Sequence, residues 1–199
     1  MICDVYEVDN MQPCSHDPRT ILKKTLESIR DIADEVYLGP EYEFHIFEDV
    51  RYKISSNEVM FQVDSSEGFW KSGETGEYFV GRKKGYHRIP PFDRLMEVRN
   101  AIVKKLIEYG VPVKYHHHEV GTCQVEIELQ LVDALHAADY TMLIKHVARM
   151  VAREFGYIIT FMPKPLYDEA GNGMHVHQFL KKDGKNIFNG NKLYNLSQE

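Results

Sequence analysis

The segment GPEYEFHIF, residues 39–47, constrains the fold of this chain more than any other. Successive side chains of a β-strand point to opposite faces, so residues two apart share a face. A strand here would carry Glu41 and Glu43 on one face and Tyr42 and Phe44 on the other. Neighbouring carboxylates repel each other unless their face is solvated or a cation lies between them. Both interpretations of the acidic face stay open on this segment alone.

Two further segments carry the same kind of spacing. Glu126 and Glu128 repeat the two-residue interval on a second predicted strand, and Glu119 lies just before the turn that leads into it. His175 and His177 stand two apart on a third predicted strand. Three strands of one sheet would bring these groups to one face. Oxygen ligands with one or two imidazoles suit Mg²⁺ or Mn²⁺ better than zinc, and carboxylates with Mg²⁺ commonly handle ATP phosphates.

Some of these residues have an equally good structural interpretation. His116, His117 and His118 alternate between the faces of a strand, so not all three can reach one site. His175 could be a packed histidine, since neutral imidazole serves either purpose. Glu128 shares a face with Glu126 but could lie at the rim of the site.

The pattern of helix and strand signals predicts an α+β fold. Asp17-Pro18 is a helix start, with Asp as N-cap and Pro at the first helical position, and Gly39-Pro40 is interpreted as a break before an extended run. Asp183-Gly184 is a strong hairpin signal. Tight hairpins favour antiparallel pairing, so helices are expected on a mostly antiparallel sheet. The expected helices are 17–35, 92–110 and 133–156, the expected strands 41–47, 57–67, 111–120, 123–131, 157–165, 173–180 and 185–188, and 68–91 is an expected long loop.

Composition narrows the class of protein. A net charge of −6 over 199 residues argues against nucleic acid as the main partner, and no apolar run approaches the ~20 residues of a membrane span. The N-terminal segment MICDVYEVDN has neither a basic start nor a long apolar stretch, so we expect no signal peptide. Three cysteines without a CxxC spacing predict reduced thiols and a cytoplasmic protein.

A series of motifs along the chain resembles the type I glutamine synthetases over nearly its whole length. The motifs are CDVY at 3–6, DPR at 17–19, GPEYEF at 39–44, GY and PPFD within 85–93, HHHEV at 116–120 followed by Glu126, MPKPLY at 162–167 and GNGMHVH at 171–177. Their order and spacing also fit. The resemblance implies that residues 1–199 form the N-terminal half of the catalytic domain, without the small N-terminal β-grasp domain and the C-terminal part of the catalytic domain.

The resemblance also implies a reaction and its partners. In that family ATP phosphorylates the γ-carboxylate of glutamate, and ammonia displaces phosphate from the acyl phosphate. ATP and Mg²⁺ or Mn²⁺ would therefore be required, and the parent protein would be a ring-shaped homo-oligomer. Roles carried over by motif are one metal ion on the glutamate side (Glu43, Glu119, Glu126), a second that bridges the ATP phosphates (Glu41, His175), glutamate binding (Gly171) and nucleotide-phosphate contact (His177). No catalytic residue is assigned.

The chain departs from the family pattern in length and at three positions. It has less than half the usual length, and the missing part normally holds a further glutamate ligand and the arginines that bind substrate, so we expect no turnover by this chain alone. Ala170, Phe179 and Lys114 stand where the family commonly has Asn, Ser and Glu. These differences leave two alternatives open: a γ-glutamyl ligase for another amine, or a non-catalytic metal- or ligand-binding remnant of the family.

Overall fold

The structure is a computed structural model that describes residues 2–71 and 78–198, and it divides into two compact units. The first unit comprises Met1–Pro40, Leu131–Met142 and Val176–Glu199, and the second comprises Glu41–Gln130 and Leu143–His175. Strand β1 (Glu35–Phe47) and helix α3 (Ala134–Glu154) each contribute to both units.

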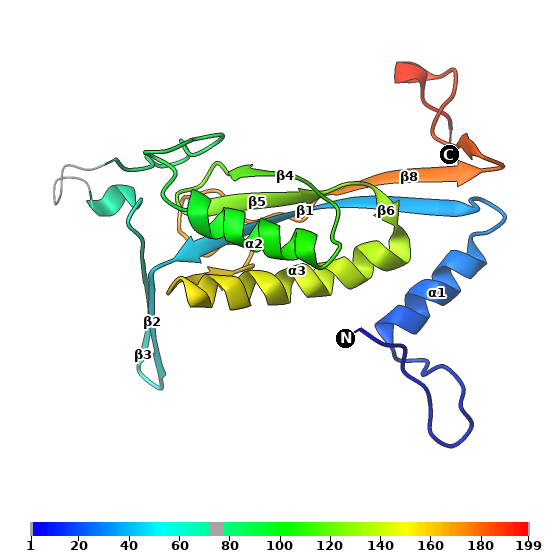
Figure 1. The fold of residues 1–199 in the computed structure, drawn as a ribbon, viewed down its shortest axis with the longest axis horizontal. Coiled ribbons are helices and arrows are strands. Elements are labelled where there is room, and N and C mark those ends of the chain that lie inside the picture. Colours follow the sequence, from blue (N-terminus) through cyan, green and yellow to red (C-terminus); the bar gives the residue numbers. More distant parts are fainter. Residues whose placement is uncertain (1, 72–77, 199) are drawn as a thin grey trace. The chain divides into compact units, whose positions relative to one another are not determined.

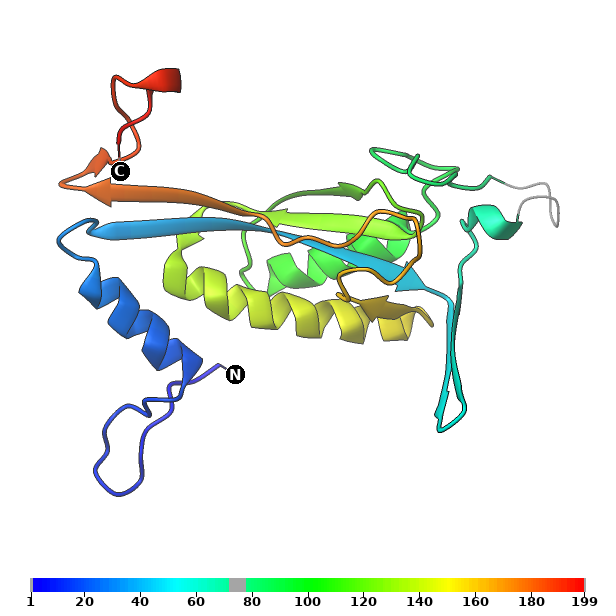
Figure 2. The ribbon, with the colours of Figure 1, turned by 180° about the vertical axis from the view of Figure 1, so that it is seen from behind.

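The first unit contains helix α1 and a small group of antiparallel strands. Its elements are α1 (Pro18–Ser28), the first part of β1, β6 (Val132–Asp133), the start of α3, β8 (Val176–Lys182), β9 (Lys185–Asn186) and a 3₁₀ turn (Leu193–Asn195). The first part of β1 pairs with β8 and with β6, and β8 pairs with β9. Figure 2 shows β1 and β8 side by side here. The predicted hairpin is confirmed: Asp183 and Gly184 have φ of 51° and 72°, as a two-residue turn requires.

The predicted helix start is confirmed, but the predicted helix end is wrong. The Asp17 side chain accepts a hydrogen bond from the Thr20 amide at 3.0 Å, and Pro18 opens the helix. The helix ends at Ser28, and it could not have continued to residue 35 because Glu35 pairs with Lys181 on β8. Backbone groups committed to a strand ladder are not available for helical hydrogen bonds.

The interpretation of Gly39-Pro40 as a break is also wrong, because β1 continues through both residues. Pro40 pairs with Val176 on one side. On the other side, β1 pairs with β6 at residues 37–38 and with β5 at residues 41–45. Proline is tolerated in a strand where no ladder bond needs its amide, and residue 40 lies between those two registers.

The second unit is built around a sheet of four antiparallel strands. Its elements are the rest of β1, β2 (Asp49–Ser55), β3 (Glu58–Asp64), a 3₁₀ turn (Phe69–Lys71), α2 (Met96–Glu108), β4 (Val113–His118), β5 (Gln124–Leu129), the rest of α3 and β7 (Ile158–Thr160). Strand β5 lies between β1 and β4, and β7 pairs with the end of β1. Figure 1 shows α2 and the end of α3 beside these strands. The α+β fold with a mostly antiparallel sheet is confirmed.

The core of the second unit lies where helix faces meet one face of this sheet. Tyr42, Phe44 and Ile46 of β1 are at most 1% exposed, as are Ile127 and Leu129 of β5. The helices contribute the buried residues Val98, Ile102, Leu106, Ile144, Val147, Ala148 and Val151. Glycines with positive φ follow both helices, Gly110 at 80° and Gly156 at 81°, as expected for helix ends.

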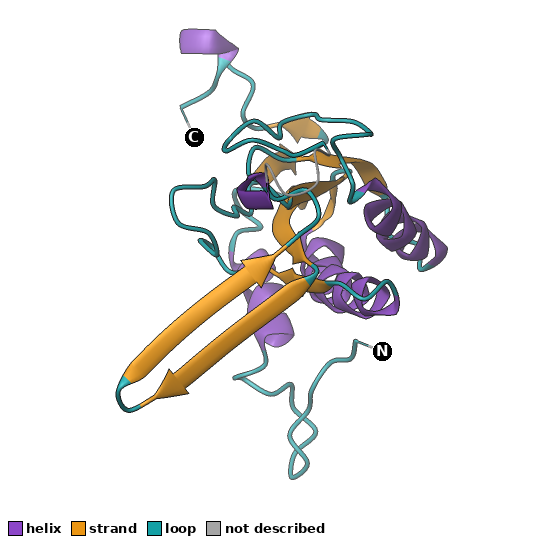
Figure 3. Cartoon of the chain, turned by 90° about the vertical axis from the view of Figure 1, so that its left-hand side faces the viewer, coloured by secondary structure: helices purple, strands orange, loops and turns teal. Residues whose placement is uncertain are grey.

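Strands β2 and β3 form a separate two-stranded hairpin (Figure 3). The sequence predicted a strand that overlaps β3 but did not predict β2. The segment 68–91 is mostly loop where it is described, and its residues 72–77 lie outside the described part of the chain. Among the helices of the described residues, none has the length and apolar composition needed to cross a membrane.

Candidate metal centre

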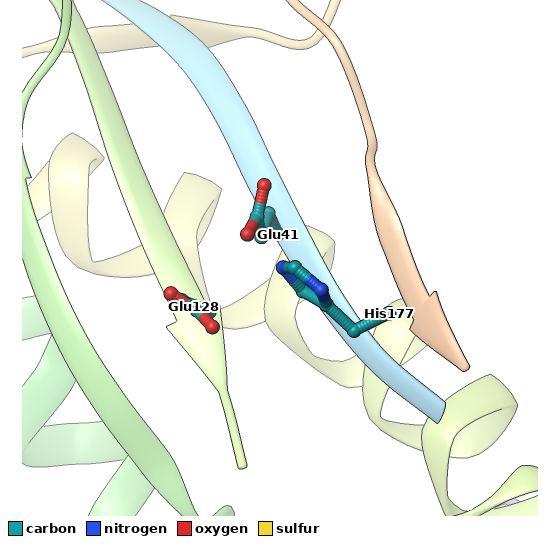
Figure 4. Close-up of side chains that lie close together, drawn as sticks. All are labelled: Glu41, Glu128 and His177. Carbon is teal, nitrogen blue, oxygen red and sulfur yellow. The ribbon is translucent and has the colours of Figure 1, made fainter. Parts of the chain in front are cut away.

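The register of β1 and β5 places two pairs of carboxylates opposite each other. Glu43 pairs with Glu126, and Glu41 pairs with Glu128. Figure 4 shows Glu41 and Glu128 on these neighbouring strands. The residues between them, Tyr42 and Ile127, are buried in the core. Like charges directly opposite each other destabilise a sheet, so this face is built at a cost.

A histidine and a third strand complete the acidic face. His117 on β4 pairs with Glu126, and its Nε2 lies 3.7 Å from Glu126 Oε2. Its Nδ1 lies 3.9 Å from Glu119 Oε1. Potential ligand atoms of His117, Glu119 and Glu126 all lie within 4.8 Å of one another. Of the three consecutive histidines, this is the one that the strand alternation turns toward the carboxylates.

The electrostatics of Glu126 show how closely the acidic groups converge. Burial raises the pKa of Glu126 from its ordinary value of 4.5 to about 8, and a hydrogen bond to Glu119 adds to this effect. The charges of Glu41, Glu119 and Glu43 raise it further. A carboxyl group in such surroundings holds a proton unless another cation replaces it. Four carboxylates from β1, β5 and the turn after β4 are therefore close enough to interact electrostatically.

Glu43 is held in place by two donors. Gln124 Nε2 donates to its Oε2 at 3.0 Å, and the Gly173 amide donates to the same oxygen at 3.0 Å. The Gln124 amide also donates to the Gly171 carbonyl at 2.8 Å. This glutamine was not singled out from the sequence, although it shares a strand face with Glu126. It links the acidic face to the loop that carries Gly171.

Two predicted site residues lie in that loop and at its end. His175 Nδ1 lies 3.2 Å from Glu41 Oε2 and 3.7 Å from Glu43 Oε1, and its side chain is 71% exposed. A Cβ atom at Gly171 would approach the Pro163 carbonyl oxygen to 2.6 Å, so only glycine fits there without a shift. The structure thus brings Glu41, Glu43 and His175 together, with Gly171 in the adjoining loop.

His177, also labelled in Figure 4, belongs to the first unit, where it lies on β8 opposite Gly39. Its contact with nucleotide phosphates stays a prediction, and His177 is not counted with the acidic face of the second unit.

The other two consecutive histidines serve the surrounding structure. His118 is fully buried and its Nε2 lies 2.9 Å from Glu67 Oε1. Burial alone would lower the pKa of His118, but the hydrogen bond and charge of Glu67 raise it overall. His116 accepts a hydrogen bond from Arg99 Nε at 2.9 Å. The expectation that the three histidines would not share one site agrees with this geometry.

The loop before α2 contributes aromatic rings that sequence reasoning did not identify. The imidazole of His87 stacks on that of His117, with centroids 4.4 Å apart and an interplanar angle of 17°. The Tyr86 ring meets both imidazoles edge-on, at 4.4 Å and 5.4 Å. The GY motif at 85–86 was noted in the sequence, but nothing local indicated that the chain would fold it onto β4.

The donor set suits a hard divalent cation. It consists of carboxylate oxygens and imidazole nitrogens from neighbouring strands, with Glu126 in need of a proton or another cation. Cys123 is the buried cysteine of this region, and its main-chain amide donates to Glu67. Oxygen-rich sets of this kind select Mg²⁺ or Mn²⁺, whereas thiolate-rich sets select zinc.

Comparison with known proteins gives a consistent result. Residues 15–199 match the family model described as glutamine synthetase, catalytic domain. Glutamine synthetase of Helicobacter pylori strain J99 is 41% identical over 206 residues, covering 100% of this chain and 43% of that protein. Glutamine synthetase of Methylococcus capsulatus is 41% identical, covering 98% and 44%.

A solved structure extends this similarity to three dimensions. The electron cryo-microscopy structure of Plasmodium falciparum glutamine synthetase superposes with a TM-score of 0.88 at 34% identity, covering 96% of this chain and 40% of that one. The chain therefore spans less than half the length of these relatives. The match to the catalytic-domain model covers most of the chain, so the chain belongs to the glutamine synthetase family.

Proposed function

We propose that this chain is part of an ATP-dependent ligase that joins ammonia to the γ-carboxylate of glutamate through a γ-glutamyl phosphate intermediate. Family membership supports the reaction class. The single observation that carries the proposal is the convergence of Glu43, Glu119 and Glu126 on one sheet face, close enough for Glu126 to have a pKa of about 8. A sheet that only needed stability would not gather carboxylates in this way.

The proposed metal ligands divide into two groups. Glu43, Glu119 and Glu126 would hold a Mg²⁺ or Mn²⁺ ion on the glutamate side, with His117 beside them. Glu41 and His175, whose side chains lie 3.2 Å apart, would hold a second ion on the ATP side. Bound divalent cations supply positive charge at the junction of two anionic substrates, which phosphoryl transfer requires.

The loop around Gly171 is the proposed contact for glutamate. Gln124 fixes the Gly171 carbonyl and the Glu43 carboxylate together, so this amide would align the substrate loop with the metal-binding face. The tight approach of Gly171 to Pro163 keeps the loop backbone close. His177 is proposed to contact the nucleotide phosphates. A ring-shaped homo-oligomer and a cytoplasmic location are proposed for the parent protein from the family alone.

A second candidate is ligation of an amine other than ammonia. It is favoured by Ala170, which stands in the proposed glutamate loop and whose Cβ faces the turn at Gly121, 3.5 Å from a Cβ built there. A methyl group at this position cannot make the hydrogen bonds of an asparagine amide. The two candidates can be separated by measuring phosphate release from the chain supplied with the remaining family segments, in the presence of ATP, glutamate and a series of small amines. Phosphate release with none of the amines would favour a non-catalytic member of the family.

The metal centre can be tested directly on the 199-residue chain. We expect Mn²⁺ to bind, and the Glu43→Gln, Glu126→Gln double variant to bind it about 100-fold more weakly, because two charged ligands are lost. The matched control is Glu58→Gln, Glu108→Gln, which changes two exposed glutamates paired with Lys53 and Lys105. Equal Mn²⁺ affinity for the site variant and the control, measured by titration with detection of free Mn²⁺, would contradict the proposal.

A further inference from the structure

Lys114 on β4 makes an ion pair with a carboxylate of the acidic face. Its Nζ lies 2.6 Å from Glu128 Oε1. The Glu128 side chain is 2% exposed and that of Lys114 is 50% exposed, so a surface lysine reaches a buried carboxylate. The Lys114 ammonium also lies over the Tyr115 ring, 5.1 Å from its centroid. Ionised donors and acceptors at this separation make the stronger class of hydrogen bond.

Tyr115 binds the same carboxylate. It pairs with Glu128 in the β4–β5 register, and a hydrogen bond to Glu128 raises the pKa of Tyr115 to about 12. Two adjacent residues of β4 thus direct an ammonium and a hydroxyl group at Glu128. This carboxylate is already supplied with a positive charge by the chain itself.

The contrast with Glu126 is informative, because the two glutamates stand two residues apart on one face of β5. Glu126 is surrounded by Glu119, Glu43 and His117, and among the described residues no lysine or arginine forms an ion pair with it. Glu128 has Lys114. The acidic face therefore lacks a compensating cation at Glu126, whereas at Glu128 the Lys114 ammonium already provides one.

The geometry points to a role for Lys114 that rests on the proposed function: Lys114 keeps Glu128 from coordinating the divalent cation held by Glu41 and His175. Glu41 and Glu128 face each other across β1 and β5, so a cation at Glu41 would otherwise be within reach of both carboxylates. With Lys114 in place, that cation would be held by one carboxylate and one imidazole of the second unit. The ammonium also repels a second cation at short range.

Removing the tethered charge should therefore create a better metal site. Lys114→Met keeps an unbranched side chain only one atom shorter than lysine. Glu128 becomes available as a ligand, and one positive charge disappears. We expect the site at Glu41 and His175 to bind Mn²⁺ about tenfold more tightly in this variant, an effect of the size expected for one nearby charge in a partly exposed site. Lys114→Arg retains the charge and should bind Mn²⁺ as the unchanged chain does.

The experiment is a Mn²⁺ titration of the 199-residue chain followed by the electron paramagnetic resonance of free Mn²⁺. Lys105→Met is the matched control, because Lys105 also pairs with a glutamate, Glu108, at 2.7 Å and is 44% exposed, but lies on α2. The double variant Lys114→Met, Glu128→Gln should return to the affinity of the unchanged chain. Circular dichroism reports whether each variant folds.

Each outcome decides a separate question. Failure of the unchanged chain to bind Mn²⁺ would overturn the proposed metal centre. If the unchanged chain binds Mn²⁺ and Lys114→Met shows no gain in Mn²⁺ affinity, only the role of Lys114 would be overturned. Glu128→Gln by itself gives an independent check that holds even if Lys114→Met does not fold. A loss of Mn²⁺ affinity in that variant well beyond the roughly tenfold expected for one nearby charge would identify Glu128 as a ligand and contradict the inference.

Discussion

The strand pair β1–β5 and the hairpin β2–β3 differ in burial: the first buries polar as well as apolar side chains, whereas the second leaves large apolar side chains exposed. Every residue of β5 is buried, including Glu126 at 6% and Glu128 at 1% exposure. In the hairpin, by contrast, Tyr52, Ile54 and Val59 are 72–80% exposed. Both regions alternate polar and apolar residues, so the alternation identifies strands without telling which face is covered. Burial depends on the helices and loops that pack from elsewhere in the chain.

The same contrast separates what each region contributes to stability. In the hairpin the apolar residues face each other across the strands, as in Tyr52↔Phe61 and Ile54↔Val59. Such cross-strand pairs contribute about 0.2–1 kcal/mol each. In the β1–β5 pair the apolar face is packed under helices, and the acidic face reduces part of that stability. A region with a costly polar face and a strong core is typical of a binding site placed on rigid elements.

The largest effect that would sharpen this comparison comes from Phe44 on β1. Its ring is 0% exposed and lies 5.0 Å from the ring of Phe161. Phe44→Ala should lower the free energy of unfolding by about 3–5 kcal/mol, because it removes a buried ring and leaves a cavity. Urea denaturation measures the change. A loss below about 1 kcal/mol, the range of surface substitutions, would mean that this strand pair is no better packed than the hairpin.

Much of this architecture was predictable because its signals are local. The cap at Asp17, the glycines after α2 and α3 and the Asp183-Gly184 turn each depend on a few neighbouring residues. The errors came where distant pairing decided the outcome. Helix α1 cannot continue to residue 35 because Glu35 belongs to a strand ladder with β8, and Pro40 is accepted because β5 and β6, on the side away from β8, do not pair with it. Neither partner could be read from the residues around positions 35 and 40.

The candidate site was predictable to a similar degree. The two-residue spacing predicted which glutamates share a face, and the structure places Glu41, Glu43 and Glu126 accordingly. Register was not predictable, so the opposition of Glu43 to Glu126 and of His117 to Glu126 emerged only from the fold. The Gln124 link to Gly171 and the Lys114 pair with Glu128 were missed because each joins segments through side chains.

A second, intermediate effect tests the cost of the acidic face. The pKa of Glu126 is raised from 4.5 to about 8, so the folded chain binds this proton more tightly than the unfolded chain does. Its contribution to stability is present below pH 4.5 and is lost as the pH rises through 8. Without metal, Glu126→Gln should therefore be more stable than the unchanged chain at pH 8.5, by about 2 kcal/mol after allowance for solvent screening.

Thermal or urea unfolding of both chains at pH 5 and pH 8.5, with a chelator present, measures this difference. His45 and His118 also have shifted pKa values, lowered to about 4 and raised, respectively, but they are present in both chains and cancel in the comparison. Equal stability of the two chains at both pH values would show that charge repulsion at Glu126 does not destabilise the fold. Any destabilisation by the acidic face would then have to come from packing.

The smallest expected effect is at Phe61, the hairpin counterpart of Phe44. Its side chain is 52% exposed and pairs across the hairpin with Tyr52. Phe61→Ala removes the same atoms as Phe44→Ala, yet it should cost less than about 1 kcal/mol, since only a cross-strand pair is lost and no cavity forms. Measured under the same urea conditions, a cost equal to that of Phe44→Ala would mean that the apolar face of the hairpin is covered in solution. The contrast between the two strand pairs would then not hold for the protein in solution.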